Sequence, residues 1–530
     1  MKLFLATLTL VVLPIFPQNV TGTISGIVHD PSGAVVPLVN ITATNTGTSA
    51  AFKTTTDETG AYFLRTLPVG IYDLAAEVNG FKKYQTKGIR LQVNEVARVD
   101  VNLAVGTAAE TVTVSSQAVV VDTTTATLKT VVDQKRIEEL PLNGRNPTQL
   151  MQLIVGVVKD TRADVTSGTT YPGTLPVSVN GNRSNSTNYV LDGAQNNDHY
   201  SNAANPMPNP DALQEFSVQT NNFSAEFGRQ SGGLVNAVTK SGTNDIHGSA
   251  FEFVRNQAIN ARNFFNPPVS PGSNVRRDDG LKRNQFGATV GGPVFIPKVY
   301  NGRDKSFFFF SYQGTAQRQT PISAGRVVPT VAQRGGDFSA ITTRSLRNPF
   351  DNLAPFPGNR IPVSLFNPVS AAILRDNIPL PTAGNTISIA PPNAYRDDQF
   401  LVRGDQQLSS ANRLSGRFWS SIASSPGLLN PANYFETVTQ RGWNNTSVTL
   451  TDTHIVSPTL TNQFLFSYNH TNGDAVPVYP AKSLKDLGVN MYNDDKPQYH
   501  ITVAGYFDTL NTGDTNDFIR KEYQFSDTMR

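Results

Sequence analysis

The apolar runs of this sequence are short, and their length limits the ways in which the chain could enter a membrane. Residues Met1–Phe16 (MKLFLATLTLVVLPIF) place one lysine before an apolar run, and polar residues begin at Gln18. Such a run is too short to cross a bilayer and is typical of a signal peptide, which we assign to residues 1–20; the alternative is a buried amino-terminal strand. No later stretch offers the ~18 uninterrupted apolar residues of a membrane helix. If the protein sits in a membrane, it must do so as a β-barrel.

Composition favours strands and excludes several kinds of site. Lys and Arg together number 44 against 41 Asp and Glu, a net charge of +3, which gives no electrostatic reason to expect nucleic acid as a partner. Cysteine is absent, which excludes disulfides and thiolate metal sites. The 40 Gly, 34 Pro, 30 Phe and 16 Tyr residues suit strands joined by turns, so we expect a mainly β fold.

Residues 21–106 read as short alternating strands separated by turn signals, which predicts a β-sandwich. One turn is Asp30-Pro31-Ser32-Gly33, in which Pro fixes φ, Asp bonds its own backbone and Gly accepts a positive φ. Thr56–Phe63 and Leu67–Leu74 likewise read as a turn that leads into a strand, and Gly80-Phe81 closes the last hairpin. These segments resemble the carboxypeptidase regulatory-like module, with its G-x-V-x-D-x-x-G, T-D-x-x-G-x-Y, L-P-x-G-x-Y and G-F pattern. The resemblance implies a Greek-key sandwich.

The resemblance is to this module and not to the peptidase. Zinc carboxypeptidases need a His-x-x-Glu ligand pair, and none of the six histidines here has a Glu three residues on. None lies in H-E-x-x-H either, so a zinc hydrolase is not expected.

Residues 107–118 are assigned to a linker that carries a short alternating segment. Glu110, Thr111, Val112, Thr113 and Val114 resemble a TonB box, an extended segment that pairs by strand addition with TonB, the periplasmic energy-coupling partner. The same alternation would suit one more strand of the sandwich. Both interpretations remain open, and a pull-down with TonB in the presence and absence of Thr111–Val114 would separate them.

Residues 119–245 change in character. Ile137 and Leu140 lie three apart, as on one face of a short helix, and Pro141 ends that helix. Further segments follow in the order Val177–Arg183, Asn188–Gly193, Ala212–Val218 and Gly232–Gly242. This order resembles the plug domain of TonB-dependent outer-membrane receptors, and most closely the Oar-like branch, in which a regulatory-like sandwich precedes the plug. Gln219–Gly228 stands where many receptors have a short Arg-Gly-Pro turn, which puts a siderophore-type substrate in doubt.

Residues 246–530 alternate over segments of about ten residues, as strands of an outer-membrane barrel do. Phe286, Ala288 and Val290 face one side, and Gln285, Gly287 and Thr289 the other. In Gln463–Asn469, Phe464, Phe466 and Tyr468 likewise oppose their neighbours. Phe307–Phe310 suit an aromatic girdle at the membrane interface, and Thr315–Asp397 reads as a long polar loop. The alternative is a large soluble sandwich, in which one face would be buried.

The region after the plug offers only 8 to 12 strands at ~10 residues each. The receptors that the chain resembles close a barrel of twenty-two strands around the plug. Phe525–Arg530 lies inside an expected strand, and an open edge in lipid leaves backbone groups unpaired. We therefore expect an incomplete barrel and a fragment of a longer protein.

No nucleophile elbow, phosphate loop, dinucleotide fingerprint or calcium loop occurs. Asp192-Gly193 and Asn196–Asp198 supply oxygen atoms, but their spacing does not fit a calcium loop. We therefore expect no enzyme activity, cofactor or metal.

The expected function is that of a TonB-dependent receptor and transporter in the outer membrane of a Gram-negative bacterium. The sandwich and plug would be reachable from the periplasm. An unidentified ligand, a carbohydrate or a peptide, would be imported with energy supplied through TonB. The competing hypothesis is a surface carbohydrate-binding or adhesion protein anchored in the membrane lipid by the barrel.

Overall fold

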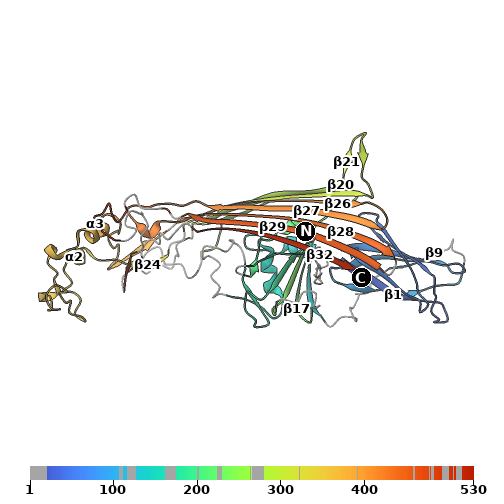
Figure 1. Ribbon diagram of the computed structural model, residues 1–530, viewed down its shortest axis with the longest axis horizontal. Coiled ribbons are helices and arrows are strands. Elements are labelled where there is room, and N and C mark those ends of the chain that lie inside the picture. Colours follow the sequence, from blue (N-terminus) through green and yellow to red (C-terminus); the bar gives the residue numbers. More distant parts are fainter. Residues whose placement is uncertain are drawn as a thin grey trace, which may run out of the picture.

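The computed structural model describes residues 21–106, 111–115, 127–160, 175–199, 202–223, 230–262, 264, 278, 280–320, 323–390, 392–457, 460–476, 478, 483–491, 501–504, 507–508 and 516–529. The fold is mainly β, as expected, and has three parts: a sandwich, a plug and a sheet of long strands. Figure 1 shows the long sheet arched over the plug, with the sandwich at the end near β1 and β9. The proposed signal peptide lies outside the described residues.

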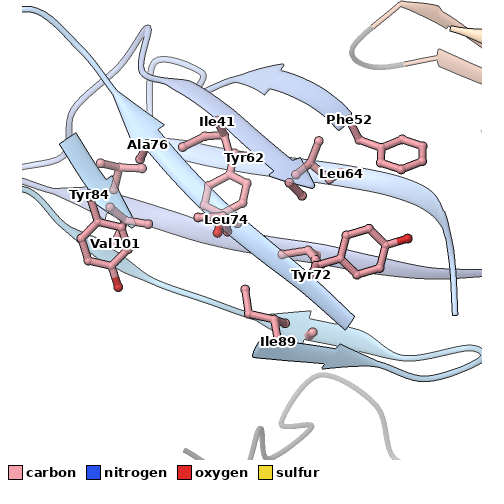
Figure 2. Close-up of a cluster of buried hydrophobic side chains, with 14 of the residues drawn as sticks. Ile41, Phe52, Tyr62, Leu64, Tyr72, Leu74, Ala76, Tyr84, Ile89 and Val101 are labelled. Atoms are coloured by element: carbon pink, nitrogen blue, oxygen red, sulfur yellow. The ribbon is translucent and has the colours of Figure 1, made fainter. Parts of the chain in front are cut away.

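The sandwich packs two sheets face to face. One has the order β4-β1-β7 with β8 also paired to β1, and the other has the order β3-β2-β5-β6-β9. Their bounds are β1 (Thr21–His29), β2 (Asn40–Asn45), β3 (Ala51–Thr55), β4 (Ala61–Pro68), β5 (Gly70–Glu77), β6 (Lys83–Leu91), β7 (Val96–Arg98), β8 (Val101–Asn102) and β9 (Thr111–Ser115). Figure 2 shows the buried side chains between the sheets, among them Ile41, Tyr62 and Leu74. Burying these apolar side chains is the main stabilising term for this part.

Two aspartates make the sandwich turns. The Asp30 carboxylate accepts hydrogen bonds from the backbone N–H of Ser32 (2.8 Å) and of Ala34 (2.9 Å). Asp57 repeats the arrangement with the backbone N–H of Thr59 (2.9 Å) and of Ala61 (3.0 Å). Hydrogen bonds from the Ser32 and Thr59 hydroxyls hold the pKa of each exposed carboxyl below its usual value. The predicted self-bonding turn at Asp30 is therefore confirmed.

The plug is a five-stranded sheet with short helices beside it. The sheet order is β10-β17-β18-β13-β14, and only β13 and β18 run parallel. Its strands are β10 (Leu128–Asp133), β13 (Asn188–Leu191), β14 (Ala194–Gln195), β17 (Leu213–Asn221) and β18 (Leu234–Thr239). Beside them lie α1 (Gln134–Glu139), the 3₁₀ helices η1 (Pro147–Leu153) and η2 (Pro210–Ala212), and the small pairs β11 (Val157–Lys159) with β12 (Val177–Val179) and β15 (Asn197–Asp198) with β16 (Ala203–Ala204).

The helix predicted around Ile137 is α1. Asp133 caps it by accepting a hydrogen bond from the Arg136 backbone N–H, and Ile137 is buried in the plug core. The helix ends before Pro141, as expected, because proline cannot continue a helix.

Eight long antiparallel strands form the third part. In order across the sheet they are β19 (His247–Asn256), β20 (Lys282–Pro293), β23 (Ser306–Gln319), β26 (Asn393–Gln407), β27 (Asn412–Ser425), β28 (Gln440–Ser457), β29 (Leu460–Val476) and β32 (Asn516–Met529). Among the described residues, β19 and β32 are the two edges of this sheet and do not pair with each other, so the barrel is not closed. None of the helices in the described part of the chain is both long and apolar enough to cross a membrane.

The two faces of this sheet have opposite chemistry. On the inner face, toward the plug, polar side chains such as Gln285, Ser311, Asn445 and Ser467 are buried. The exposed outer face carries apolar side chains, among them Phe286, Val290, Phe400, Phe418, Ile422, Leu450, Phe464, Ile519 and Phe525. The predicted alternation of β20 and β29 is thus confirmed, and it has the polarity of a strand with lipid on its outer side.

The interpretation of Phe307–Phe310 as one aromatic girdle is wrong in part. Phe307 and Phe309 are 5% and 1% exposed and point inward, because successive side chains of β23 alternate between the faces. Outward aromatic contacts form across strands instead. The ring centroids of Tyr312 and Phe400 lie 5.0 Å apart, as do those of Tyr468 and Tyr523.

The expected long loop is also shorter than predicted. Thr315 pairs with Asp397 and Arg318 with Ala394, so both ends of that segment belong to β23 and β26. Between them lies an insertion with β24 (Ser323–Val327), α2 (Val331–Arg334), η4 (Pro357–Asn359), η5 (Val363–Leu365), α3 (Pro368–Asp376) and β25 (Thr386–Ile389). It has a small core of its own, to which Phe435 contributes from η6 (Tyr434–Glu436). Figure 1 places it at the end of the sheet opposite the sandwich.

Small pairs complete the structure. The β21 (Phe295–Ile296) and β22 (Tyr300–Asn301) hairpin lies between β20 and β23, and β30 (Thr502–Val503) pairs with β31 (Phe507–Asp508) before β32.

Candidate functional site

The candidate site is the contact between the plug and the inner face of the sheet, where ion pairs and hydrogen bonds join the two parts. It starts at the tight turn between β13 and β14, where Asp192 has φ 49° and Gly193 φ 83°. Positive φ at both central residues defines a two-residue hairpin turn that Asp-Gly suits well. The turn brings the Asp192 carboxylate against β18, where it accepts hydrogen bonds from the Thr239 backbone N–H and the Thr239 hydroxyl, both at 2.8 Å.

Two arginines of the sheet meet that carboxylate. Arg417 of β27 places Nη1 3.1 Å from Asp192 Oδ2, and Arg403 of β26 places Nη1 3.6 Å from Oδ1. Arg403 also donates to the Thr239 carbonyl at 2.8 Å and forms a two-point ion pair with Asp405. Arg417 is only 4% exposed. These ion pairs cross from the plug to the sheet and are held away from solvent, where losing one partner is costly.

A second contact involves Arg145, which follows α1. It pairs with Asp211 inside the plug and donates through Nε to Gln313 Oε1 of β23 at 3.2 Å. The Arg145 guanidinium also lies over the Phe251 and Phe253 rings of β19, 4.5 and 4.2 Å from their centroids. Burial lowers the pKa of Arg145 and raises that of Asp211.

A third contact joins the plug to the last two strands of the sheet. Arg520 of β32 lies 2.6 Å from Asp198 Oδ2, and His199 Nε2 lies 2.7 Å from Glu522 Oε1. The Gln195 backbone bonds to Gln524 through its N–H, at 2.9 Å, and to Asn469 through its carbonyl, at 3.1 Å. Asp192 and Asp198, which the sequence offered only as weak calcium candidates, are therefore anchors of the plug.

Apolar contact between the plug and the sheet is concentrated in a small cluster. Ala212 of the plug packs with Phe309, Leu401 and Trp419 of the sheet. Most of the remaining contacts named above are hydrogen bonds and ion pairs, so the plug is held mainly by polar interactions.

The plug also contacts the sandwich through Glu215 of β17. Both carboxylate oxygens of Glu215 lie 3.1 Å from the backbone nitrogen of Val93, in the turn after β6. Lys129 of β10 donates to the Val93 carbonyl. Burial raises the pKa of Glu215 to about 7, more than nearby Lys129 lowers it.

The predicted TonB-contact segment lies at the edge of the sandwich. Glu110 is outside the described residues, whereas Thr111–Val114 lie in β9. β9 pairs in parallel with β6, Lys83 with Thr111 through Lys87 with Ser115. Val112 is 38% exposed. The extended conformation and the edge position suit both interpretations of the segment.

The described part of the chain holds no group of three or more His, Asp or Glu side chains arranged to bind a metal ion. Sequence reasoning missed the anchoring residues Arg145, Arg403, Arg417 and Arg520. For Arg403, Arg417 and Arg520 the available signal was an arginine at an inward-facing strand position, which in a barrel needs a carboxylate partner.

Three family models match the chain in succession. Residues 23–104 match the carboxypeptidase regulatory-like domain, residues 121–235 the TonB-dependent receptor plug domain and residues 238–530 the outer membrane beta barrel domain. The TonB-dependent transporter Oar of Myxococcus xanthus is 30% identical over 317 residues, which cover 56% of this chain. The match spans only 27% of that relative, about a quarter of its length.

Solved structures with detectable similarity include the siderophore receptor PirA from Acinetobacter baumannii, with 14% identity and a TM-score of 0.40 over 75% of this chain and 44% of that one. The outer membrane transporter YddB from Escherichia coli has 11% identity and a TM-score of 0.35 over 76% and 54%. The barrel match alone covers more than half of the chain, and the plug and sandwich matches precede it in order. The chain therefore belongs to the TonB-dependent receptors of the Gram-negative outer membrane, with an N-terminal carboxypeptidase regulatory-like domain.

Proposed function

We propose that the whole protein binds a ligand at the cell surface and imports it with energy supplied through TonB. The observation that carries this proposal is the polar attachment of the plug. Asp192, Asp198 and Arg145 hold it through ion pairs and hydrogen bonds, with one small apolar cluster. When such an interface separates, water forms hydrogen bonds with the polar groups that become exposed. Its separation therefore costs less free energy than that of an apolar interface of equal area.

The energy for moving the plug would have to come from a partner. The sequence has no phosphate loop or dinucleotide fingerprint, and we propose a receptor rather than an enzyme. We assign the coupling contact to Glu110–Val114. The edge position of β9 and its exposed Val112 suit strand addition, in which the partner's backbone pairs with an extended segment.

The ligand would bind at the end of the sheet that carries the insertion between β23 and β26. Two connections at the sandwich end are short, Gln407 to Asn412 and Ser457 to Leu460, and a third is the small β21–β22 hairpin, whereas the opposite end carries long, partly folded segments. Barrels of the outer membrane have short periplasmic turns and longer outer loops. Exposed Phe350, Val363 and Leu365 on the insertion suit a carbohydrate or a peptide as ligand.

The test compares surface binding with uptake in cells that make the whole protein. Labelled oligosaccharide and peptide pools are offered to cells with and without TonB. We expect binding in both strains and accumulation only when TonB is present. Binding without accumulation in either strain would instead favour the alternative, a surface carbohydrate-binding or adhesion protein anchored by the barrel.

A further inference from the structure

A cavity of about 310 Å³ lies where the sandwich, the plug and the sheet meet. Phe52 and Val69 of the sandwich and Phe307 of β23 form apolar walls, and Thr239 of the plug closes another side. Three buried or partly buried arginines line it, Arg403, Arg413 and Arg417, together with the carboxylates of Asp192 and Asp405. The volume is that of a small molecule's site, with apolar walls and few charged groups.

Both of these carboxylates are already paired with other groups. Asp405 accepts from Arg403 Nε (2.9 Å) and Nη2 (3.1 Å) and from the hydroxyls of Ser241 (2.8 Å) and Ser415 (2.7 Å). Asp192 has the two hydrogen bonds from Thr239 and the ion pairs with Arg403 and Arg417 described above. A carboxylate offers about four lone-pair sites. Asp405 therefore has none left for a third arginine, and Asp192 is already paired with Arg403 and Arg417.

Arg413, at the start of β27, is that third arginine. Its Nε is buried and meets no hydrogen-bond acceptor among the described residues, and the same is true of Arg417 Nε. Asp304 also lines the cavity, but it is exposed, and its carboxylate accepts from Asn244 at 2.7 Å. Leaving out the exposed Asp304, the charged groups that line the cavity thus comprise three cations and two anions. Arg413 has the charge of Asp405 to oppose its own, but it shares that carboxylate with Arg403. A bound anion would complete the counter-charge of this partly buried cation.

We infer that this cavity is a binding site for a small organic anion, a carboxylate or a phosphate ester with a compact apolar part. Its charged group pairs with Arg413, and its apolar part lies against Phe52 and Val69. Because the walls come from all three parts of the chain, the bound anion also links the sandwich to the adjacent end of the sheet. This inference is independent of the transported ligand and of TonB.

Equilibrium dialysis of the detergent-solubilised protein tests the proposed anion site. The two probes are radiolabelled butyrate and radiolabelled inorganic phosphate, each measured against sodium chloride at matched ionic strength. We expect saturable binding of one equivalent. Arg413→Gln should weaken it at least tenfold. Arg303→Gln, which removes the same charge from an exposed turn at the same end of the sheet, should bind as the wild type does. Binding of only one probe identifies the charged group and still supports the site.

A second variant keeps the test decisive if Arg413→Gln does not fold. Val69→Phe narrows the cavity from the sandwich side and leaves Arg413 in place. It should also lose binding. The inference is overturned if the wild type binds neither probe saturably, or if these variants bind both probes as tightly as the wild type does.

Discussion

Asp192 connects the plug to the sheet through one carboxylate. The Asp-Gly turn presents it, Thr239 of the neighbouring plug strand fixes it by two hydrogen bonds, and Arg417 and Arg403 of the sheet neutralise it. Because one side chain makes all of these contacts, a single substitution at Asp192 tests the attachment of the plug directly.

Asp192→Asn removes the negative charge and keeps the shape of the side chain. Arg403 and Arg417 then lose a buried counter-charge, for which we expect a loss of about 3–5 kcal/mol in the free energy of plug attachment. Faster cleavage of the plug by added protease, in protein whose sheet remains intact, measures the loss. Asp337→Asn, a partly exposed aspartate of the insertion, is the control. Equal cleavage of Asp192→Asn and the wild type would contradict the anchoring role.

Glu215 gives the junction between sandwich and plug a pH dependence. Its pKa is raised from 4.5 to about 7, because burial disfavours the ionised form. The folded state therefore binds the proton more tightly than the unfolded state does. The contribution of Glu215 to stability is fully present below pH 4.5, is lost as the pH rises toward 7 and is absent above that, a change of about 3 kcal/mol.

Glu215→Gln should abolish this slope, whereas Glu58→Gln on an exposed sandwich turn should retain it. Unfolding midpoints of the sandwich and plug, measured across this pH range, provide the comparison. The same slope in Glu215→Gln and the wild type would show that other groups cause it.

At the scale of elements, β9 is the strand whose position has most bearing on function. It is the last strand of its sheet, and its parallel pairing with β6 occupies the backbone groups that a strand-adding partner would use on that side. If TonB needs both edges of the segment, β9 must leave β6 before it is bound.

A disulfide between β6 and β9 tests this requirement, and the chain is suited to it because it contains no cysteine. Gln85 and Thr113 are direct partners in the register, so Gln85→Cys with Thr113→Cys should form the bond. We expect the oxidised protein to lose binding to the periplasmic domain of TonB and the reduced protein to regain it. The pair Asn40→Cys with Thr55→Cys, between β2 and β3, should have no effect. Binding by the oxidised β6–β9 variant would mean that β9 is recognised in place.

Local features were predictable, and long-range ones were not. The turn at Asp30 and the alternation around Phe286 depend on neighbours in the sequence, and both are confirmed. The ion pair of Asp192 with Arg417 joins segments far apart in the chain, and nothing in either segment identifies the other. Phe307 and Phe309 were assigned to the wrong face because four aromatic residues in a row carry no alternation, so only the register of β23 in the sheet decides their direction.

At the scale of the whole molecule, the polar plug interface predicts that the plug and the sheet separate before the sheet unfolds. The chain has two tryptophans. Trp419 is fully buried in the cluster with Ala212 of the plug, whereas Trp443 packs with Ala423 of the sheet. Trp419 therefore reports on the plug contact.

In a Trp443→Phe variant, moderate urea should shift the Trp419 emission to the red while the circular dichroism of the strands is retained. In Trp419→Phe, the emission of Trp443 should change only with the strands. Coincident transitions for all these signals would indicate that plug and sheet unfold as one unit.

The position of β10 has a mechanical consequence. β10 is the edge strand of the plug sheet, and it is the first plug strand after β9 in the chain. A pull transmitted from β9 therefore loads β10 before any other plug strand. Applied across the strands, the pull opens the pairs with β17 one at a time, starting at Leu128 and Asn221, whereas along the strands it loads all of them together. The direction of the force thus decides whether the plug unravels from one edge at low force or resists and moves as a body.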